Sequence, residues 1–115
     1  MICVVIRTDR NGLLRSVYVT GHARHAKRGR DIVCAAVSAI SRSAARILEL
    51  DGRIEVVGDA QEPGRLSFEV PTYESGAEEY IRGVTDFLVL GLADISREYP
   101  QRCCVEVKEE QTNGT

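Results

Sequence analysis

The order in which the spacing of apolar residues changes along the chain is the feature that most restricts its fold. Residues 2–8 and 13–20 are rich in valine and isoleucine and flank Asp9-Arg10-Asn11-Gly12. Because an Asn-Gly pair tolerates positive φ, the two segments are predicted to form a β-hairpin. From Asp31 the apolar residues recur at helical spacing, which predicts an amphipathic helix with Asp31 as N-cap and Gly52 as its stop.

The second half of the chain follows the same plan. Residues 53–57 and 65–70 are predicted strands joined by a turn over 58–64, and a last strand is expected over 102–108. Ser75 and Glu78 resemble a capping box for a second helix ending near Pro100. Its expected apolar stripe is Ala77, Tyr80, Ile81, Val84, Phe87, Leu88, Gly91, Leu92 and Ile95. The order ββαββαβ indicates an α+β fold, with a mainly antiparallel sheet covered by two helices.

Size and composition limit the domain count and the cellular setting. A chain of 115 residues, 43% of them hydrophobic, fits one domain over residues 1–108, followed by a polar tail over 109–115 that we expect to be flexible. No segment reads as a membrane span or signal peptide, so a cytoplasmic protein without membrane contact is expected. The net charge of −2 gives no overall attraction to nucleic acid. The cysteines are then expected to be reduced thiols.

One histidine and one cysteine form a candidate catalytic pair. His22 precedes a predicted loop and Cys34 follows it, in the first turn of the first predicted helix. Unpaired backbone N–H groups and the helix dipole favour a thiolate there. In this reading Cys34 is the nucleophile and His22 is the base and then the acid. Backbone amides at the helix start or in the loop are the expected oxyanion donors.

Four neighbouring residues are candidates for supporting roles. Asp31 either orients His22 or, as we favour, caps the helix. Ser38 lies one turn after Cys34, where its hydroxyl can reach the sulfur or bond the carbonyl one turn back. Gly21 and Gly29 bracket the loop as hinges or as ordinary turn residues.

Two further interpretations of the same segment remain open. Zinc is one, since suitable donors are present in His22, His25, Cys34 and either Cys103 or Cys104, but their spacing matches no common zinc motif. The other is a non-enzymatic, ribosome- or RNA-associated binding module that uses a basic loop over 24–30. That loop contains Arg24, Lys27, Arg28 and Arg30. No aromatic residue is interleaved with these charges, so we expect substrate steering and no direct nucleic-acid binding. Cys3, Cys103 and Cys104 are interpreted as structural.

The chain resembles a known protein family in the same segment. The triplet Gly-His-Ala at 21–23 and the glycine before Asp-Ile-Val-Cys-Ala-Ala-Val-Ser at 31–38 are similar to the ribosomal-processing cysteine protease family, Prp. The resemblance implies a His22 and Cys34 dyad, no cofactor, a homodimer, and a flexible loop that orders over bound peptide. It also implies that the substrate is the N-terminal extension of ribosomal protein L twenty-seven. Lys27 and Arg28 depart from the acidic or aromatic residues common in the family's loop.

Overall fold

The computed structural model describes residues 1–21, 32–62 and 65–110. The strands are β1 (Ile2–Thr8), β2 (Leu14–Thr20), β3 (Val57–Glu62), β4 (Arg65–Glu69) and β5 (Cys103–Glu109). The helices are α1 (Ile32–Glu49) and α2 (Glu78–Glu98). The predicted α+β class and the order ββαββαβ are therefore confirmed.

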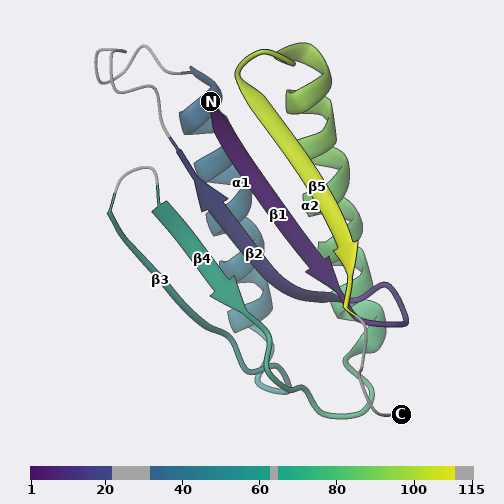
Figure 1. Ribbon diagram of the computed structural model, residues 1–115. Helices are drawn as coiled ribbons and strands as arrows, with labels where there is room; N and C mark the ends of the chain where they lie inside the picture. Colours follow the sequence, from purple (N-terminus) through teal and green to yellow (C-terminus); the bar gives the residue numbers. More distant parts are fainter. Residues whose placement is uncertain (22–31, 63–64, 111–115) are drawn as a thin grey trace.

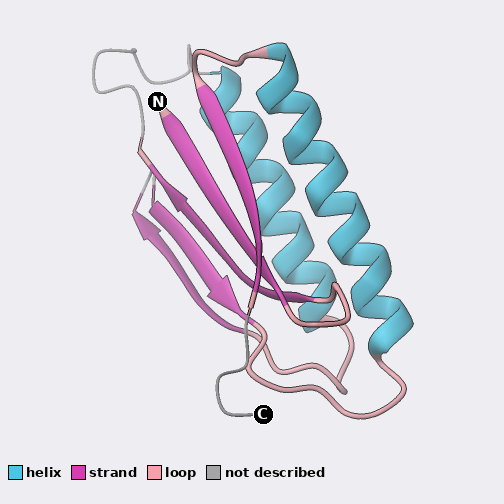
Figure 2. Ribbon diagram, turned by 45° about the vertical axis from the view of Figure 1, so that its right-hand side comes forward, coloured by secondary structure: helices cyan, strands magenta, loops and turns pink. Residues whose placement is uncertain are grey.

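The five strands form one sheet, in the order β3-β4-β2-β1-β5. All neighbouring pairs are antiparallel except β1 and β5, which are parallel. Both helices lie side by side on one face of this sheet, and the other face is not covered by any described element (Figure 2). The C-terminal end of β2 and the N-terminal end of α1 lie at the same end of the molecule (Figure 1).

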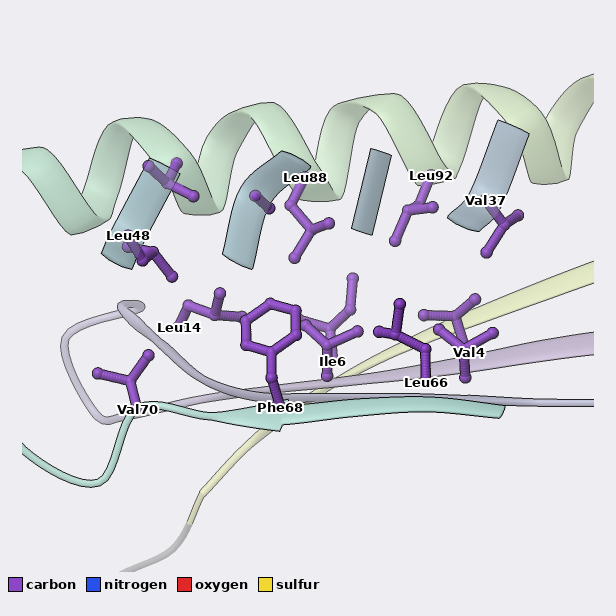
Figure 3. Close-up of a cluster of buried hydrophobic side chains, with 14 of the residues drawn as sticks. Val4, Ile6, Leu14, Val37, Leu48, Leu66, Phe68, Val70, Leu88 and Leu92 are labelled. Carbon is purple, nitrogen blue, oxygen red and sulfur yellow. The ribbon is translucent and has the colours of Figure 1, made fainter. Parts of the chain in front are cut away.

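The core fills the space between the sheet and the two helices. Val4 and Ile6 of β1 and Leu88 and Leu92 of α2 are fully buried and face one another across this layer (Figure 3). Burying a side chain of this size contributes about 1.5–3 kcal/mol. Alternate residues of β1 point into the core, as expected for a strand covered on one face. Val37 of α1 belongs to the same buried cluster, which holds the helix and its first turn against the sheet.

The turn between β1 and β2 forms as predicted from its polar residues. The Asp9 carboxylate accepts hydrogen bonds from the backbone N–H groups of Asn11 and Leu13, at 2.8 and 3.0 Å. Gly12 has φ of +79°, which L side chains rarely adopt. These contacts close the hairpin and set the register of the two strands.

The strand predicted over 53–57 is wrong in its position. Residues before Val57 follow a turn, in which the Asp51 carboxylate accepts a hydrogen bond from the Arg53 N–H at 3.0 Å. The strand β3 instead covers Val57–Glu62, most of which lies in the turn predicted over 58–64. Gly58 pairs with Phe68, and a Cβ on Gly58 would lie 2.5 Å from the Phe68 Cβ. This glycine is needed for close strand approach and not for a turn.

The start of α2 also differs from the expected capping box. The N-cap is Ala77, which has no side-chain capping bond, so Ser75 does not cap the helix. The Glu78 carboxylate accepts a hydrogen bond from the Gly76 N–H at 2.7 Å, and Gly76 has φ of +102°. The glycine turns the chain one residue after Ser75, and the helix therefore begins later than predicted.

Two predictions for the C-terminal part of the chain differ from the structure. The predicted apolar stripe of α2 includes Phe87, but its side chain is 47% exposed and points away from the core. Glu109 is the last residue of β5, and the Glu110 N–H donates a hydrogen bond to the Thr8 carbonyl oxygen at 2.6 Å. The predicted tail over 109–115 therefore starts at least two residues too early, and residues 111–115 lie outside the described residues.

Candidate active site

Cys34 is in the first turn of α1, as the sequence predicts. Its side chain is half-buried and packs against the edge of the core. The first N–H groups of a helix have no partner within the helix, and the positive end of its dipole lies there. A carbonyl oxygen near this turn can therefore accept backbone N–H hydrogen bonds.

Most of the other predicted site residues fall outside the described part of the structure. They belong to residues 22–31 and comprise His22, Arg24, His25, Lys27, Arg28, Gly29, Arg30 and Asp31. The structure does describe the two ends of this segment, Gly21 after β2 and Ile32 at the start of α1. Both ends lie at the same end of the sheet (Figure 1).

Gly21 has a backbone conformation that depends on its lack of a side chain. Its φ is +86°, and a Cβ at this position would overlap the carbonyl oxygen of Met1. Thr20, just before it, is paired with Cys3 of β1. Gly21 therefore turns the chain at the end of β2, next to the start of β1. The next residue in the sequence is His22.

Ser38 lies one turn after Cys34 on the same side of α1 and is half-buried. Its two predicted roles, a contact with the Cys34 sulfur or a hydrogen bond to the carbonyl one turn back, both stay predictions.

The remaining cysteines are free thiols, and the pKa is raised for two of them, Cys103 and Cys104. Cys103 is buried on the helix-facing side of β5, and burial raises its pKa. Cys104 is exposed on the other face, next to Cys3 in the parallel register. A hydrogen bond with the Cys3 side chain, with a further contribution from burial, raises the pKa of Cys104 to about 11. These positions support a structural interpretation of the three residues.

The zinc interpretation gains no support from the described residues. No group of three or more histidine, cysteine, aspartate or glutamate side chains within them is arranged to hold a metal ion. Cys103 and Cys104 are adjacent in β5 and face opposite sides of the sheet.

Neither α1 nor α2 is long and apolar enough to cross a membrane.

A groove lies beside α1 that was not predicted from the sequence. Arg42 and Arg46 line it, on the flank of the helix that continues from Cys34 and Ser38. The available signal was the four-residue spacing from Cys34 through Ser38 to Arg42, which places these residues along one flank of a helix. The opposite wall comes from β3 and β4, whose pairing could not be read from the sequence.

Comparison with known proteins identifies the protein family to which the chain belongs. Residues 1–104 match the family model described as Cysteine protease Prp. The ribosomal processing cysteine protease Prp of Bacillus subtilis (strain 168) is 29% identical over 101 residues, covering 86% of this chain and 90% of the relative.

Solved structures share the fold. A Streptococcus mutans protein matches with a TM-score of 0.76 and 25% identity, covering 96% of both chains. The ribosomal processing protease Prp of Staphylococcus aureus, bound to a substrate peptide, matches with a TM-score of 0.74 and 23% identity over 94% of this chain and all of that one. The match of residues 1–104 to the family model identifies the protein class as cysteine protease. The chain belongs to the cysteine protease Prp family.

Proposed function

We propose that this protein is an endopeptidase in which Cys34 is the nucleophile and His22 the general base. The observation that carries the proposal is the family match over residues 1–104, which contain both side chains, together with the position of Cys34 in the first turn of α1. Cys104 and Cys103 are poor alternatives, because the pKa of each thiol is raised. A raised pKa leaves little thiolate at neutral pH.

The proposed reaction is a two-step acyl transfer. The Cys34 sulfur attacks the scissile carbonyl carbon, and the oxyanion accepts hydrogen bonds from backbone N–H groups at the start of α1. The C–N bond then breaks as His22 passes its proton to the leaving amine. Water, deprotonated by His22, hydrolyses the thioester and regenerates the thiol. A Staphylococcus aureus relative with a covalently linked product peptide supports a covalent intermediate of this kind.

The proposed substrate is the N-terminal extension of ribosomal protein L twenty-seven. Support comes from the relatives, which are named ribosomal processing proteases. We also propose that the enzyme is cytoplasmic, because its proposed substrate is a ribosomal protein. Asp31 would cap α1 or orient His22, and Gly29 would allow the segment between the pair to close over the peptide. No metal or organic cofactor enters this scheme.

We also propose that the protein acts as a homodimer. The outward face of the helix layer supports this, because Phe87 and Leu90 of α2 are 47% and 64% exposed. Large apolar side chains gathered on an exposed face are typical of interaction surfaces. Sedimentation of the purified protein tests the dimer, and Leu90→Lys is expected to weaken it.

The decisive experiment is incubation with an N-terminally extended ribosomal protein L twenty-seven. The expected result is one new N-terminus, detected by mass spectrometry, with wild-type protein and with Cys104→Ala. Cys34→Ala and His22→Ala should give no product. Cleavage by Cys34→Ala would overturn the assignment of the nucleophile. No observation favours the alternative of a binding module that uses residues 24–30.

A further inference from the structure

A groove lies between the flank of α1 and the β3–β4 edge of the sheet, with a volume of about 200 Å³. Its floor is apolar and consists of Ala45, Val56, Leu66 and Phe68. Gly58 of β3 also lines the groove and contributes no side chain to fill it. The groove is therefore open because α1 faces a glycine at the edge of the sheet.

The rim of the groove is positively charged. Arg42 and Arg46 are exposed, lie one turn apart on α1, and form no ion pair within the described parts of the chain. Glu49 is the one acidic residue among those that line the groove. Like charges four residues apart in a helix repel each other. The charged residues around the apolar pocket are two arginines and one glutamate, so their net charge is +1.

The groove lies on the same flank of α1 as the proposed nucleophile. Cys34, Ser38 and Arg42 are spaced four residues apart, which places them along one side of a helix. Helix rise puts Arg42 about 12 Å and Arg46 about 18 Å beyond Cys34. An extended peptide advances about 3.3 Å per residue. A substrate held at Cys34 would therefore reach the groove about four or five residues from the scissile bond.

We propose that this groove is a remote substrate subsite that binds an apolar side chain and an adjacent carboxylate. The apolar side chain enters the floor over Leu66 and Phe68, and the carboxylate pairs with Arg42 and Arg46. The volume is below the roughly 300–1,000 Å³ of typical small-molecule sites, which suits a single side chain better than a nucleotide or cofactor. The proposal rests on the proposed function, in which Cys34 attacks the peptide bond.

The test uses peptides derived from the extended substrate and a charge-reversed enzyme. Leucine is placed four residues from the scissile bond and glutamate or lysine five residues from it, in separate series for each side. The wild-type enzyme is expected to prefer glutamate about two- to fivefold in kcat/KM, within the range for exposed ion pairs. Arg42→Glu/Arg46→Glu should invert the preference. Replacing the leucine by alanine should lower kcat/KM about tenfold.

Matched controls separate the groove from general effects of charge and bulk. Arg10→Glu changes an exposed arginine in the β1–β2 turn, at the opposite end of the sheet from Cys34, and should keep the wild-type preference (Figure 1). Ala45→Met should fill the floor and remove the advantage of leucine over alanine. Ser43→Met adds the same side chain at an exposed site on α1 outside the groove and should preserve that advantage.

A binding measurement distinguishes failure of this proposal from failure of the proposed function. The same peptides, labelled for fluorescence anisotropy, are titrated against Cys34→Ala with and without the arginine reversals. Charge-dependent binding without cleavage by the wild type would refute the proposed function and support the groove. Cleavage or binding with the same glutamate-to-lysine ratio in all variants would refute the groove.

Discussion

Gly21 lies against the carbonyl oxygen of Met1, so a Cβ atom could not fit at this position. The contact joins the end of β2 to the start of β1, and the φ of +86° at Gly21 directs the chain toward residue 22. This glycine is required by a tertiary contact as well as by its own dihedral angle.

Gly21→Ala is therefore expected to destabilise the protein. A left-handed conformation costs a non-glycine residue about 1–2 kcal/mol, and relief of the overlap with Met1 adds to this. Chemical denaturation should show a lower free energy of unfolding, and cleavage should fall with it. Gly83→Ala is the control, because it lies in α2 with nothing within 4 Å of an added Cβ. It should raise stability by about 0.5–1 kcal/mol.

Cys34→Ala is expected to abolish cleavage and leave the protein folded. The side chain is half-buried at a helix end, so the lost volume is small, but no other atom can replace the sulfur. Circular dichroism and thermal unfolding check the fold, and mass spectrometry checks the product. If turnover persists in protein purified free of wild type, another group performs the attack.

Cys104 should react with alkylating reagents only at high pH. Its pKa is raised to about 11, with the Cys3 hydrogen bond as the largest cause. A raised pKa keeps the thiol protonated at pH 7–9, so the rate of iodoacetamide labelling should rise only as pH approaches 11. Cys3→Ala removes the hydrogen bond and should shift the profile to lower pH. Peptide mapping follows each cysteine separately, and unchanged profiles would contradict the hydrogen bond.

Ser41→Ala is expected to stabilise the protein. The Ser41 side chain is fully buried and its hydroxyl has no hydrogen-bond partner in the described structure. An unsatisfied buried polar group costs about 1–3 kcal/mol, and alanine is also the better helix former. Urea denaturation should therefore show a gain of about 1–2 kcal/mol.

The contrasting variant for Ser41 is Thr85→Val. The Thr85 hydroxyl donates to the Ile81 carbonyl oxygen at 2.7 Å and accepts from the Leu14 N–H at 3.0 Å. Its removal leaves a buried N–H unpaired and should cost about 1–3 kcal/mol. Equal losses in both variants would show that the Ser41 hydroxyl is also paired.

Neutralising the basic residues of the segment 24–30 should slow substrate capture. Arg24, Lys27, Arg28 and Arg30 are replaced together by glutamine. The loss should be largest for acidic or RNA-associated substrates and should shrink as salt rises, because exposed charges are screened beyond about 8–10 Å. Stopped-flow or initial-rate measurements over a salt series provide the check. Loss of all hydrolysis at every salt concentration would make these residues part of the catalytic machinery.

Local sequence was sufficient for the order of elements and for the environment of Cys34. The Asn-Gly turn and the spacing of apolar residues after Asp31 are short-range signals. They placed the β1–β2 hairpin and the first turn of α1 within a residue of the structure. The family resemblance rested on the same segment, and the match over residues 1–104 confirms it. The pairing of His22 with Cys34 remains a prediction, since His22 is outside the described residues.

Tertiary structure decided what depends on partners distant in the sequence. Glycine is typical of turns, yet Gly58 belongs to β3 because it pairs with Phe68 of the neighbouring strand. Phe87 fits the helical stripe of α2 but is exposed, because the helix presents only part of its apolar residues to the sheet and α1. The groove beside Arg42 exists only through the pairing of β3 with β4. Periodicity specifies which residues share a face, but strand order and packing determine what that face meets.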